Sequence, residues 1–316
     1  MPTPVPTRPA NPERWFRTRP DSSVLTRPRL LARSLIHATD LDDHITFYEH
    51  LLAVDADLRM PIPDFGGLEL AAIGNLLLIA SERPFTPMQR RTAYSLIVPS
   101  LTTQLTLLHT TATTVLEAPE PILPGARARV RYPDGQLAEL VEHRPYPGEQ
   151  PRTRTTTNAN SANDNTADNS TNGTIDGGSS GGTGVSGGGG AAARDRAPQL
   201  LVRRAVPEEE FTTTLRLYEH LLQAPALTGP APTGPHPARC AVIGNLLLVA
   251  RTTPDPAPCP TALVLPPTAT TTTGNGNGNG NGHRNKDGNG DEGGGTVLLA
   301  GGVRAELWQT PHGQQH

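Results

Sequence analysis

The side chains near the start of the chain that could do chemistry lie along one alternating stretch. Arg33, Leu35 and His37 are two residues apart, so on an extended strand their side chains share one face. An arginine can bind a carboxylate or a phosphate through two parallel hydrogen bonds, whereas a histidine can ligate a metal ion. The pattern therefore allows an anion site, or part of a metal site, on this strand.

A segment near the other end of the chain matches part of a calcium-binding loop. Residues 285–291 follow the start of that pattern, but Asn285 occupies its first position, Glu292 stands where an apolar residue is typical, and Thr296 replaces the bidentate Glu. A tract of Asn, Gly and Asp generates such a match by composition alone. We therefore predict no calcium site, and the sequence contains neither a Gly-rich phosphate loop nor a nucleophile elbow.

Composition divides the chain into globular and polar stretches. Glycine and proline contribute 32 and 33 of the 316 residues, and apolar residues make up only 35%, below the roughly 45–50% typical of a globular domain. The deficit lies in stretches rich in Pro, Thr, Asn, Gly and Ser, which bury too little apolar surface to offset the entropy of ordering. We predict a disordered tail at 1–28, a first domain at 29–149 and a disordered linker at 150–197. A second domain at 198–311 is interrupted by a disordered loop at 268–295.

Charge and cysteine content exclude a few classes of protein. The 27 basic and 30 acidic residues give a net charge of −3, so no broad basic surface favours nucleic acid. No apolar run reaches the roughly 18–20 residues of a membrane helix, and the N-terminus lacks the apolar segment of a secretory signal. We therefore expect a cytoplasmic protein with neither nucleic acid nor membrane as a partner. Cys240 and Cys259 are too few for a disulfide framework or a four-cysteine zinc site.

The chain contains an internal repeat. The sequence Tyr-Glu-His-Leu-Leu at 48–52 recurs at 218–222, and the apolar run at 73–80 recurs at 243–250 with the same offset and no gap. Ala-Glu-Leu at 138–140 also recurs near the C-terminus, but a Thr-rich tract and an Asn-Gly run replace much of the second copy before it. We interpret this pattern as a duplication whose second copy is degenerate.

Hydrophobic spacing predicts the elements of the first unit. A short apolar strand at 34–38 precedes a helix at Leu41–Leu52, with Asp40 placed to cap its start. A Gly-Asn turn then joins two apolar runs, 68–73 and 76–81, into a hairpin. The sequence therefore predicts a β-α-β-β arrangement.

A second unit of the same kind follows in the first domain. A strand at 94–98 precedes a helix at 101–111, and strands at 126–132 and 137–142 flank a Pro-Asp-Gly turn. The first domain is therefore expected to contain the same motif twice.

Three motifs, in this order, give the first domain a resemblance to a known family. Asp40 lies seven residues before the Phe-Tyr pair of a helix that ends in Leu-Leu, residues 67–74 begin the hairpin, and the Pro-Asp-Gly turn is followed by Glu139-Leu140. The chain resembles the vicinal oxygen chelate superfamily, which includes glyoxalase I, bleomycin-resistance proteins, fosfomycin-resistance enzymes and extradiol dioxygenases. The resemblance implies an α+β glyoxalase/bleomycin-resistance fold, with paired βαβββ modules in two tandem domains.

The resemblance also implies where a metal ion would lie. Metal-dependent members hold a divalent ion with His, Gln or Glu from several strands, so that two neighbouring substrate oxygens can chelate it. The family's first ligand position is occupied here by Arg33, by Arg203 in the second copy, and by about Ala93 in the second unit. Arginine cannot ligate a cation. Only Glu139 and its counterpart Glu306 match a ligand position.

We therefore expect a metal-independent protein that binds or sequesters a small organic molecule in a cleft, with no cofactor. The candidate ligand-binding residues are Arg33, His37, Glu139, Glu69 and Tyr94, with Arg203 and Glu306 in the second copy. Arg33 should lie within salt-bridge reach of Glu139, either as a structural pair or as a binding group; a solvent-facing arginine at a strand start is the alternative. The second copy has either a binding role or a purely structural one.

A metal-dependent lyase or dioxygenase is the competing hypothesis. His37 and Glu139 would then hold a divalent Fe, Mn, Ni or Zn ion, with help from another copy or subunit. One His and one Glu make an incomplete site, and the counterpart of His37 is Pro207, so we favour a His37 that only lines or packs beside the pocket. The ligand stays open, as do internal pairing of the two domains and a homodimer.

Overall fold

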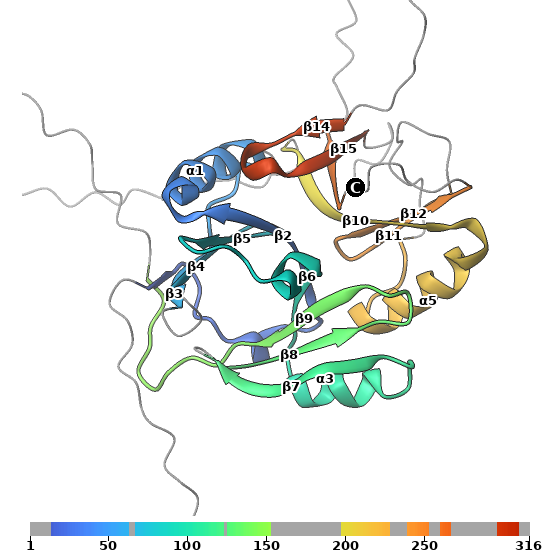
Figure 1. Cartoon of the computed structure of the whole chain (residues 1–316), viewed down its shortest axis with the longest axis horizontal. Helices are drawn as coiled ribbons and strands as arrows, with labels where there is room; N and C mark the ends of the chain where they lie inside the picture. Colours follow the sequence, from blue (N-terminus) through green and yellow to red (C-terminus); the bar gives the residue numbers. More distant parts are fainter. Residues whose placement is uncertain are drawn as a thin grey trace, which may run out of the picture.

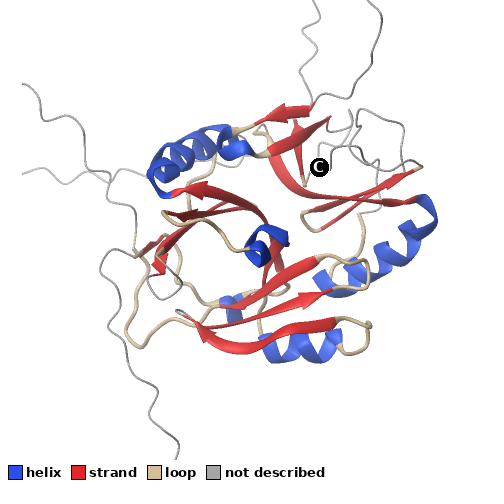
Figure 2. Cartoon of the chain, in the orientation of Figure 1, coloured by secondary structure: helices blue, strands red, loops and turns tan. Residues whose placement is uncertain are grey.

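The computed structural model describes residues 14–62, 67–122, 125–152, 197–227, 239–252, 260–266 and 296–309. Within these residues the chain forms two curled, mixed β-sheets with few helices, an α+β architecture (Figures 1 and 2). The predicted loop at 268–295 lies outside the described residues, as does the predicted linker apart from its first and last positions. Of the helices that the structure describes, none combines the length and the apolar character needed to cross a bilayer.

The first module of the larger sheet contains the predicted elements and one more strand. Its elements are β2 (Arg29–His37), α1 (Leu41–Leu52), β3 (Leu58–Ile62), β4 (Leu68–Ile73) and β5 (Leu76–Ser81). The strands lie in the order β3-β4-β5-β2. The bounds of α1, β4 and β5 agree with the predicted ones, whereas β2 begins earlier, at Arg29. The sequence did not predict β3, because Arg59 and Pro61 interrupt its apolar pattern.

The second module repeats this order. Its elements are β6 (Thr92–Ile97), α3 (Leu101–Leu108), β7 (Thr114–Ile122), β8 (Gly125–Arg131) and β9 (Leu137–Glu142), preceded by the short α2 (Pro87–Arg91). The strands lie in the order β6-β9-β8-β7, and antiparallel pairing of β2 with β6 joins the two modules. The sequence did not predict β7, since two prolines and several exposed residues obscure its alternation. Each module is thus a βαβββ unit.

The described part of the predicted disordered tail is ordered. β1 (Trp15–Phe16) pairs with β3 and makes the larger sheet nine-stranded, and the 3-10 turn η1 (Ser22–Val24) follows. Phe16 is buried against Met60 and Ile62. The prediction of disorder is therefore wrong for residues 14–28, because the aromatic side chains in this Pro/Arg-rich stretch supply apolar surface that the sheet can bury.

The second, smaller sheet has the strand order of the six central strands of the first. Its elements are β10 (Gln199–Pro207), α5 (Phe211–Leu222), β11 (Cys240–Ile243), β12 (Leu246–Arg251), β13 (Thr261–Leu265), β14 (Thr296–Leu298) and β15 (Arg304–Gln309). They lie in the order β11-β12-β10-β13-β15-β14, which corresponds to β4-β5-β2-β6-β9-β8. The stretches where counterparts of β3, α3 and β7 would fall lie outside the described residues.

The two sheets contact each other through reciprocal hydrogen bonds. The Asn75 side chain donates to the carbonyl of Leu200 at 3.2 Å, and its counterpart Asn245 donates to the carbonyl of Leu30. The two helices also make reciprocal contacts. The Tyr48 hydroxyl on α1 donates to the Ala300 carbonyl at 2.7 Å, and the Tyr218 hydroxyl on α5 donates to Asp134 Oδ2 at 3.1 Å. Each helix thus reaches a turn of the other half, and Figure 1 shows α1 beside β14 and β15.

Candidate functional site

The concave face of the nine-stranded sheet encloses a pocket with a volume of about 600 Å³. Strand alternation decides which side chains reach it. On β2, Leu31 and Arg33 line the pocket, whereas Leu30 and Ala32 point to the opposite face and join the core shared with the helices. The same alternation applies on β6 and β9, where Ser95 and Glu139 line the pocket.

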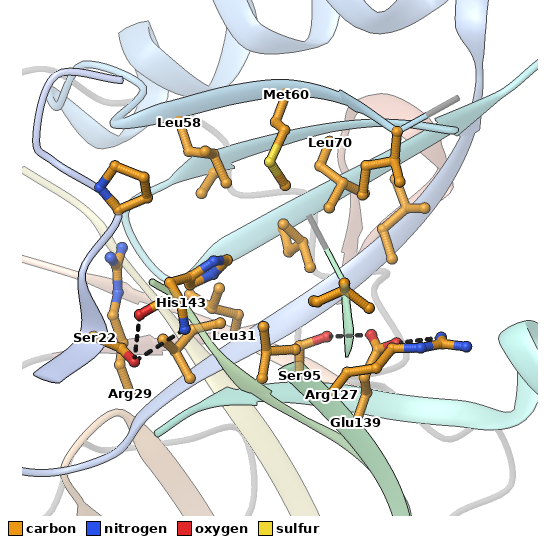
Figure 3. Close-up of a pocket in the computed structure, with 18 of the residues that line it drawn as sticks. Ser22, Arg29, Leu31, Leu58, Met60, Leu70, Ser95, Arg127, Glu139 and His143 are labelled. Atoms are coloured by element: carbon orange, nitrogen blue, oxygen red, sulfur yellow. Dashed lines mark hydrogen bonds and ion pairs between the residues drawn. The ribbon is translucent and has the colours of Figure 1, made fainter. Parts of the chain in front are cut away.

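The first module supplies an apolar wall to this pocket. The wall consists of side chains from β2, β3, β4 and β5, among them Leu31, Leu58, Met60, Leu70, Leu77 and Ile79. In Figure 3, Leu58, Met60 and Leu70 face the space from the side opposite to Ser95, Arg127 and Glu139. The pocket therefore has an apolar side and a charged side.

Glu139 is the centre of the charged side. Arg127 Nη1 donates to its Oε1 at 3.0 Å, Ser95 Oγ donates to its Oε2 at 3.3 Å, and Arg129 Nη2 lies 3.6 Å from Oε1. Burial acts to raise the pKa of Glu139, but the guanidinium groups of Arg33, Arg129 and Arg127 outweigh it and hold the pKa below its usual value. Glu139 is therefore an ionised carboxylate whose oxygens already have donors.

Arg33 lies beside this carboxylate without a hydrogen bond to it. Its Nη1 is 3.7 Å from Glu139 Oε2, and its side chain is only 5% exposed. Among the described residues, the Nε and Nη1 atoms of Arg33 have no hydrogen-bond acceptor. Burial lowers the pKa of Arg33, opposed by the charge of Glu139. The predicted salt-bridge reach is confirmed, although the pair is loose. Arg33 is buried in the middle of β2, so the alternative of a solvent-facing arginine at a strand start is wrong.

The N-terminal segment closes one end of the pocket. From β1 at the edge of the sheet it runs to Ser22, whose hydroxyl donates to the Val98 carbonyl at 2.6 Å beyond the end of β6. The backbone N–H of His143, beyond the end of β9, donates to Ser22 Oγ at 3.1 Å (Figure 3). Residues 18–22 therefore contribute to the pocket lining, a role that composition alone did not indicate.

His37 does not lie in this pocket, so its assignment to the cleft is wrong. It shares the face of Arg33 on β2, but it is the last residue of the strand and is exposed. Its Nδ1 accepts a hydrogen bond from the backbone N–H of Thr39 at 3.3 Å and caps the 3-10 turn η2 (Ala38–Asp40). The predicted cap by Asp40 is also wrong, since its side chain makes no capping bond to α1 and instead accepts from Thr39 Oγ1.

Tyr94 and Glu69 also face away from the pocket. Tyr94 pairs with Ala32 in the β2–β6 register, which turns it to the core face, where its hydroxyl lies 2.9 Å from that of Tyr218. Glu69 lies on the face of β4 opposite to Leu70, and its Oε1 accepts from Arg59 Nε at 2.5 Å. Both assignments are corrected because the register of the strands, which the sequence did not give, decides the face.

The second sheet contains the corresponding pair in a closed form. Arg203 Nε donates to Glu306 Oε2 at 2.6 Å and Arg203 Nη2 to Oε1 at 3.4 Å. Arg251 Nη2 donates to Oε1 at 2.8 Å, and the indole N–H of Trp308 donates to Oε2 at 2.9 Å. The side chains of Arg203 and Glu306 are 1% and 7% exposed. The positions of Leu31, Leu77 and Ile79 are here taken by Leu201, Leu247 and Val249, which pack with Trp308 in a hydrophobic cluster.

Arg127, Arg129 and Ser95 are site residues that sequence reasoning missed. The signal was present in part, because Arg127 and Arg129 alternate in Gly125–Arg131 and so must share a face of β8. The β8–β9 register places Arg129 opposite Glu139, and the β6–β9 register places Ser95 opposite it. Without these registers the pocket face could not be distinguished from the other one.

The residues present do not fit the divalent ion that the fold family implies. Within the described ranges, no group of three or more His, Cys, Asp or Glu side chains is arranged to hold a metal ion. Arg33 stands at the expected ligand position, and Glu139 is surrounded by guanidinium groups. A cation placed beside Glu139 would be repelled by three positive charges.

Comparisons with known proteins give likenesses at low identity. No protein-family model and no curated protein matches the chain. An uncharacterized protein from Methanosarcina mazei is 33% identical, over 37% of this chain and 92% of that one, with a TM-score of 0.33. Methylmalonyl-CoA epimerase from Mycobacterium tuberculosis is 18% identical, over 39% and 91%, with a TM-score of 0.30. The 2,2',3-trihydroxybiphenyl 1,2-dioxygenase of a dibenzofuran-degrading Sphingomonas wittichii is 11% identical, over 90% and 91%, with a TM-score of 0.38.

These similarities transfer no activity to the chain, and the strand order itself identifies the fold. Both modules of the larger sheet are βαβββ units, and the smaller sheet repeats the order of the six central strands. The chain has the paired βαβββ fold of the vicinal oxygen chelate type, as its motifs predicted.

Proposed function

We propose that the protein binds a small organic molecule in the pocket of the nine-stranded sheet without a metal ion, and that it carries or sequesters this molecule. The observation that supports the proposal most strongly is Arg33. Its buried guanidinium has two nitrogens for which the described part of the chain supplies no acceptor, and it lines a pocket whose opposite wall is apolar. Such a pocket, mostly apolar with a few convergent polar groups, is typical of small-molecule sites.

The state of Glu139 favours binding over acid–base catalysis. A general base works best when its pKa lies near the pH at which the protein operates. The three guanidinium groups lower the pKa of Glu139 despite its burial, so this carboxylate is a weak base for the Ser95 hydroxyl or for a substrate. Its role in the proposal is to hold the arginines in place.

A neutral fluorescent probe tests this proposal on the full chain. We expect N-phenyl-1-naphthylamine to bind saturably, with the same affinity in the presence and absence of EDTA, because the apolar wall alone accepts it. Leu70→Trp should weaken binding, because its larger ring occupies part of the space beside the apolar wall, whereas Leu227→Trp, at a residue that is 67% exposed, should leave it unchanged. Circular dichroism would verify that both variants are folded.

Metal analysis of the same preparation tests the metal-independent part of the proposal. Protein purified without chelators should contain no stoichiometric Fe, Mn, Ni or Zn. One equivalent of such a metal, lost in Glu139→Ala, would contradict the proposal and favour a metal-dependent lyase or dioxygenase. A probe affinity that is unchanged by Leu70→Trp would place the binding site elsewhere.

A further inference from the structure

We infer that the ligand of this pocket is an amphipathic monocarboxylate, whose carboxylate pairs with Arg33 and whose apolar body lies against the wall of the first module. The inference rests on the proposed function of the pocket and adds to it the chemical class of the ligand. It follows from the Arg33 donors that meet no acceptor among the described residues, from the charges around Glu139, and from the chemistry of the two sides of the pocket.

Arg33 has hydrogen-bond donors that a carboxylate ligand could use. A guanidinium has five N–H donors in a planar fork that matches the two oxygens of a carboxylate. The side chain of Arg33 is only 5% exposed, and its Nη1 lies 3.7 Å from Glu139 Oε2. The described residues nevertheless offer no hydrogen-bond acceptor to its Nε and Nη1. A buried charged group without its hydrogen bonds is costly, so an anion that supplies acceptors would gain more here than at the surface.

The charged groups around Arg33 limit the charge of the ligand that the pocket can accept. On the charged side, the guanidinium groups of Arg33, Arg127 and Arg129 line the pocket with Glu117 and Glu139, and Arg127 also forms an ion pair with Glu120. Arg129 donates to Glu117 and Arg127 to Glu139, which leaves Arg33 as the positive charge with the loosest partner. The three carboxylates equal the three guanidinium groups in number, so a ligand gains here mainly the hydrogen bonds of Arg33, whose planar fork matches one carboxylate. A dianion would place its second charge beside Glu139 and Glu117, where repulsion disfavours it.

The apolar wall of the pocket determines the chemistry of the rest of the ligand. The wall opposite the charged side contains leucines from several strands together with Met60, and Figure 3 shows Leu58, Met60 and Leu70 turned towards Ser95 and Glu139. Burial of apolar ligand surface on this wall supplies affinity at about 25 cal/mol per Å². A methionine adapts its shape to different apolar groups. The wall therefore selects for an aromatic or aliphatic body, and the charged side orients the carboxylate.

The corresponding pair in the second sheet has a different arrangement. There Arg203 donates two hydrogen bonds directly to Glu306, at 2.6 and 3.4 Å, and the apolar residues of that face pack against Trp308. In the first sheet it is Arg127, and not Arg33, that donates to the glutamate. The donors of Arg33 can therefore bind a ligand.

Isothermal titration calorimetry of the full chain with three matched probes tests the inference. The probes are 1-naphthoate, 1-naphthylmethanol and 1-naphthylmethylammonium, which share one apolar body and differ in charge. We expect 1-naphthoate to bind about 10- to 100-fold more tightly than the alcohol, the range expected for a hydrogen bond to a charged group. The ammonium compound should bind more weakly than the alcohol, because it meets the guanidinium groups.

Variants assign the preference to Arg33. Arg33→Met should abolish the difference between carboxylate and alcohol while the alcohol still binds, and Arg33→Lys, which keeps the charge without the fork, should keep only part of it. Arg216→Met removes the same charge from α5, where the side chain is 77% exposed, and should leave the preference intact. The comparison of probes on the wild-type chain stands even if an Arg33 variant fails to fold.

The outcomes separate this inference from the proposed function. If the neutral alcohol binds but the carboxylate gains nothing over it, or if Arg33→Met keeps the preference, the inference is overturned while the binding pocket stands. If neither the alcohol nor the carboxylate binds, both are overturned.

Discussion

The two arginine–glutamate pairs occupy equivalent places in the two sheets but differ in their contacts. Arg33 and Arg203 are each the fifth residue of a nine-residue strand, and each strand pairs in parallel with the second strand of a hairpin. The first pair is separated by 3.7 Å without a hydrogen bond, whereas the second is joined at 2.6 Å and is almost fully buried. The position of an arginine in the fold therefore does not determine its role; the neighbours of its glutamate partner do.

The cause of the difference lies in the strands beside each glutamate. Arg129 is paired with Glu139 across β8 and β9, but Thr296 is paired with Glu306 at the equivalent place on β14 and β15. Trp308 in turn occupies the place of Val141 and donates its indole N–H to Glu306. The second pair is therefore held by its surroundings in a closed form, while the first pair faces a pocket.

The largest expected effect is on the closed pair. Glu306→Leu removes the carboxylate that the buried Arg203 and the partly buried Arg251 share, and we expect it to lower the free energy of unfolding by about 3–5 kcal/mol. Glu139→Leu should cost less, because the guanidinium groups around it can interact with water in the pocket. Urea denaturation at neutral pH measures both. Equal losses would contradict the assignment of one pair as closed and the other as open.

The arginines provide a second comparison of stability. Arg33→Met should change the free energy of unfolding by less than about 1 kcal/mol, since Glu139 keeps Arg127 and Ser95 as donors and methionine fills a similar volume. Arg203→Met should cost at least about 2 kcal/mol more, because it removes two charged hydrogen bonds to Glu306. If Arg33→Met proves the more damaging change, Arg33 is the structural residue of the two.

The acid limb of stability is a third test and concerns Glu139. Its pKa in the folded protein lies below the ordinary value of 4.5, so the unfolded chain binds the proton more readily. The stabilising contribution of Glu139 is therefore fully present at pH above about 4.5 and is lost as the pH falls through the lowered folded-state pKa. In denaturation series from about pH 7 down to about pH 3, the stability gap between the wild type and Glu139→Gln should narrow on the acid side. A gap independent of pH would show that Glu139 is not held ionised by the arginines.

The smallest effects are expected where the two halves are equivalent. Asn75 and Asn245 donate to backbone carbonyls of the opposite sheet in a reciprocal manner. Replacement of either by alanine should lower the free energy of unfolding by about 1 kcal/mol, with similar values for the two. Thermal or urea unfolding of both variants measures this. A large inequality would contradict the pseudo-twofold relation between the sheets.

The sequence predicted the elements that carry a strong periodic pattern. The helix at Leu41–Leu52 and the hairpin strands Leu68–Ile73 and Leu76–Ser81 agree with the structure, because their apolar residues repeat at helical or hairpin spacing. β3 and β7 were missed, since prolines and charged residues interrupt their alternation. The motifs, rather than the periodicity, gave the correct βαβββ fold.

The sequence predicted the site only in part. It placed Arg33 near Glu139, but it treated the two as an isolated pair. Arg127 and Arg129 reach Glu139 only through the β8–β9 register, which no local pattern specifies. His37 has the correct strand face but lies at the strand end, where capping of the next turn takes its ring out of the pocket. Local sequence patterns thus predicted which residues share a face of a strand. The neighbours of Glu139 depend on the pairing between strands that are distant in the sequence.

A crystal structure of the full chain with 1-naphthoate tests the central claim most directly. We predict the carboxylate within about 2.7–3.0 Å of guanidinium nitrogens of Arg33, the naphthyl ring against Leu58, Met60 and Leu70, and the Arg203–Glu306 pair unchanged. A carboxylate bound by Arg203, or a ring in the pocket with its carboxylate turned away from Arg33, would contradict the distinction between an open and a closed pair.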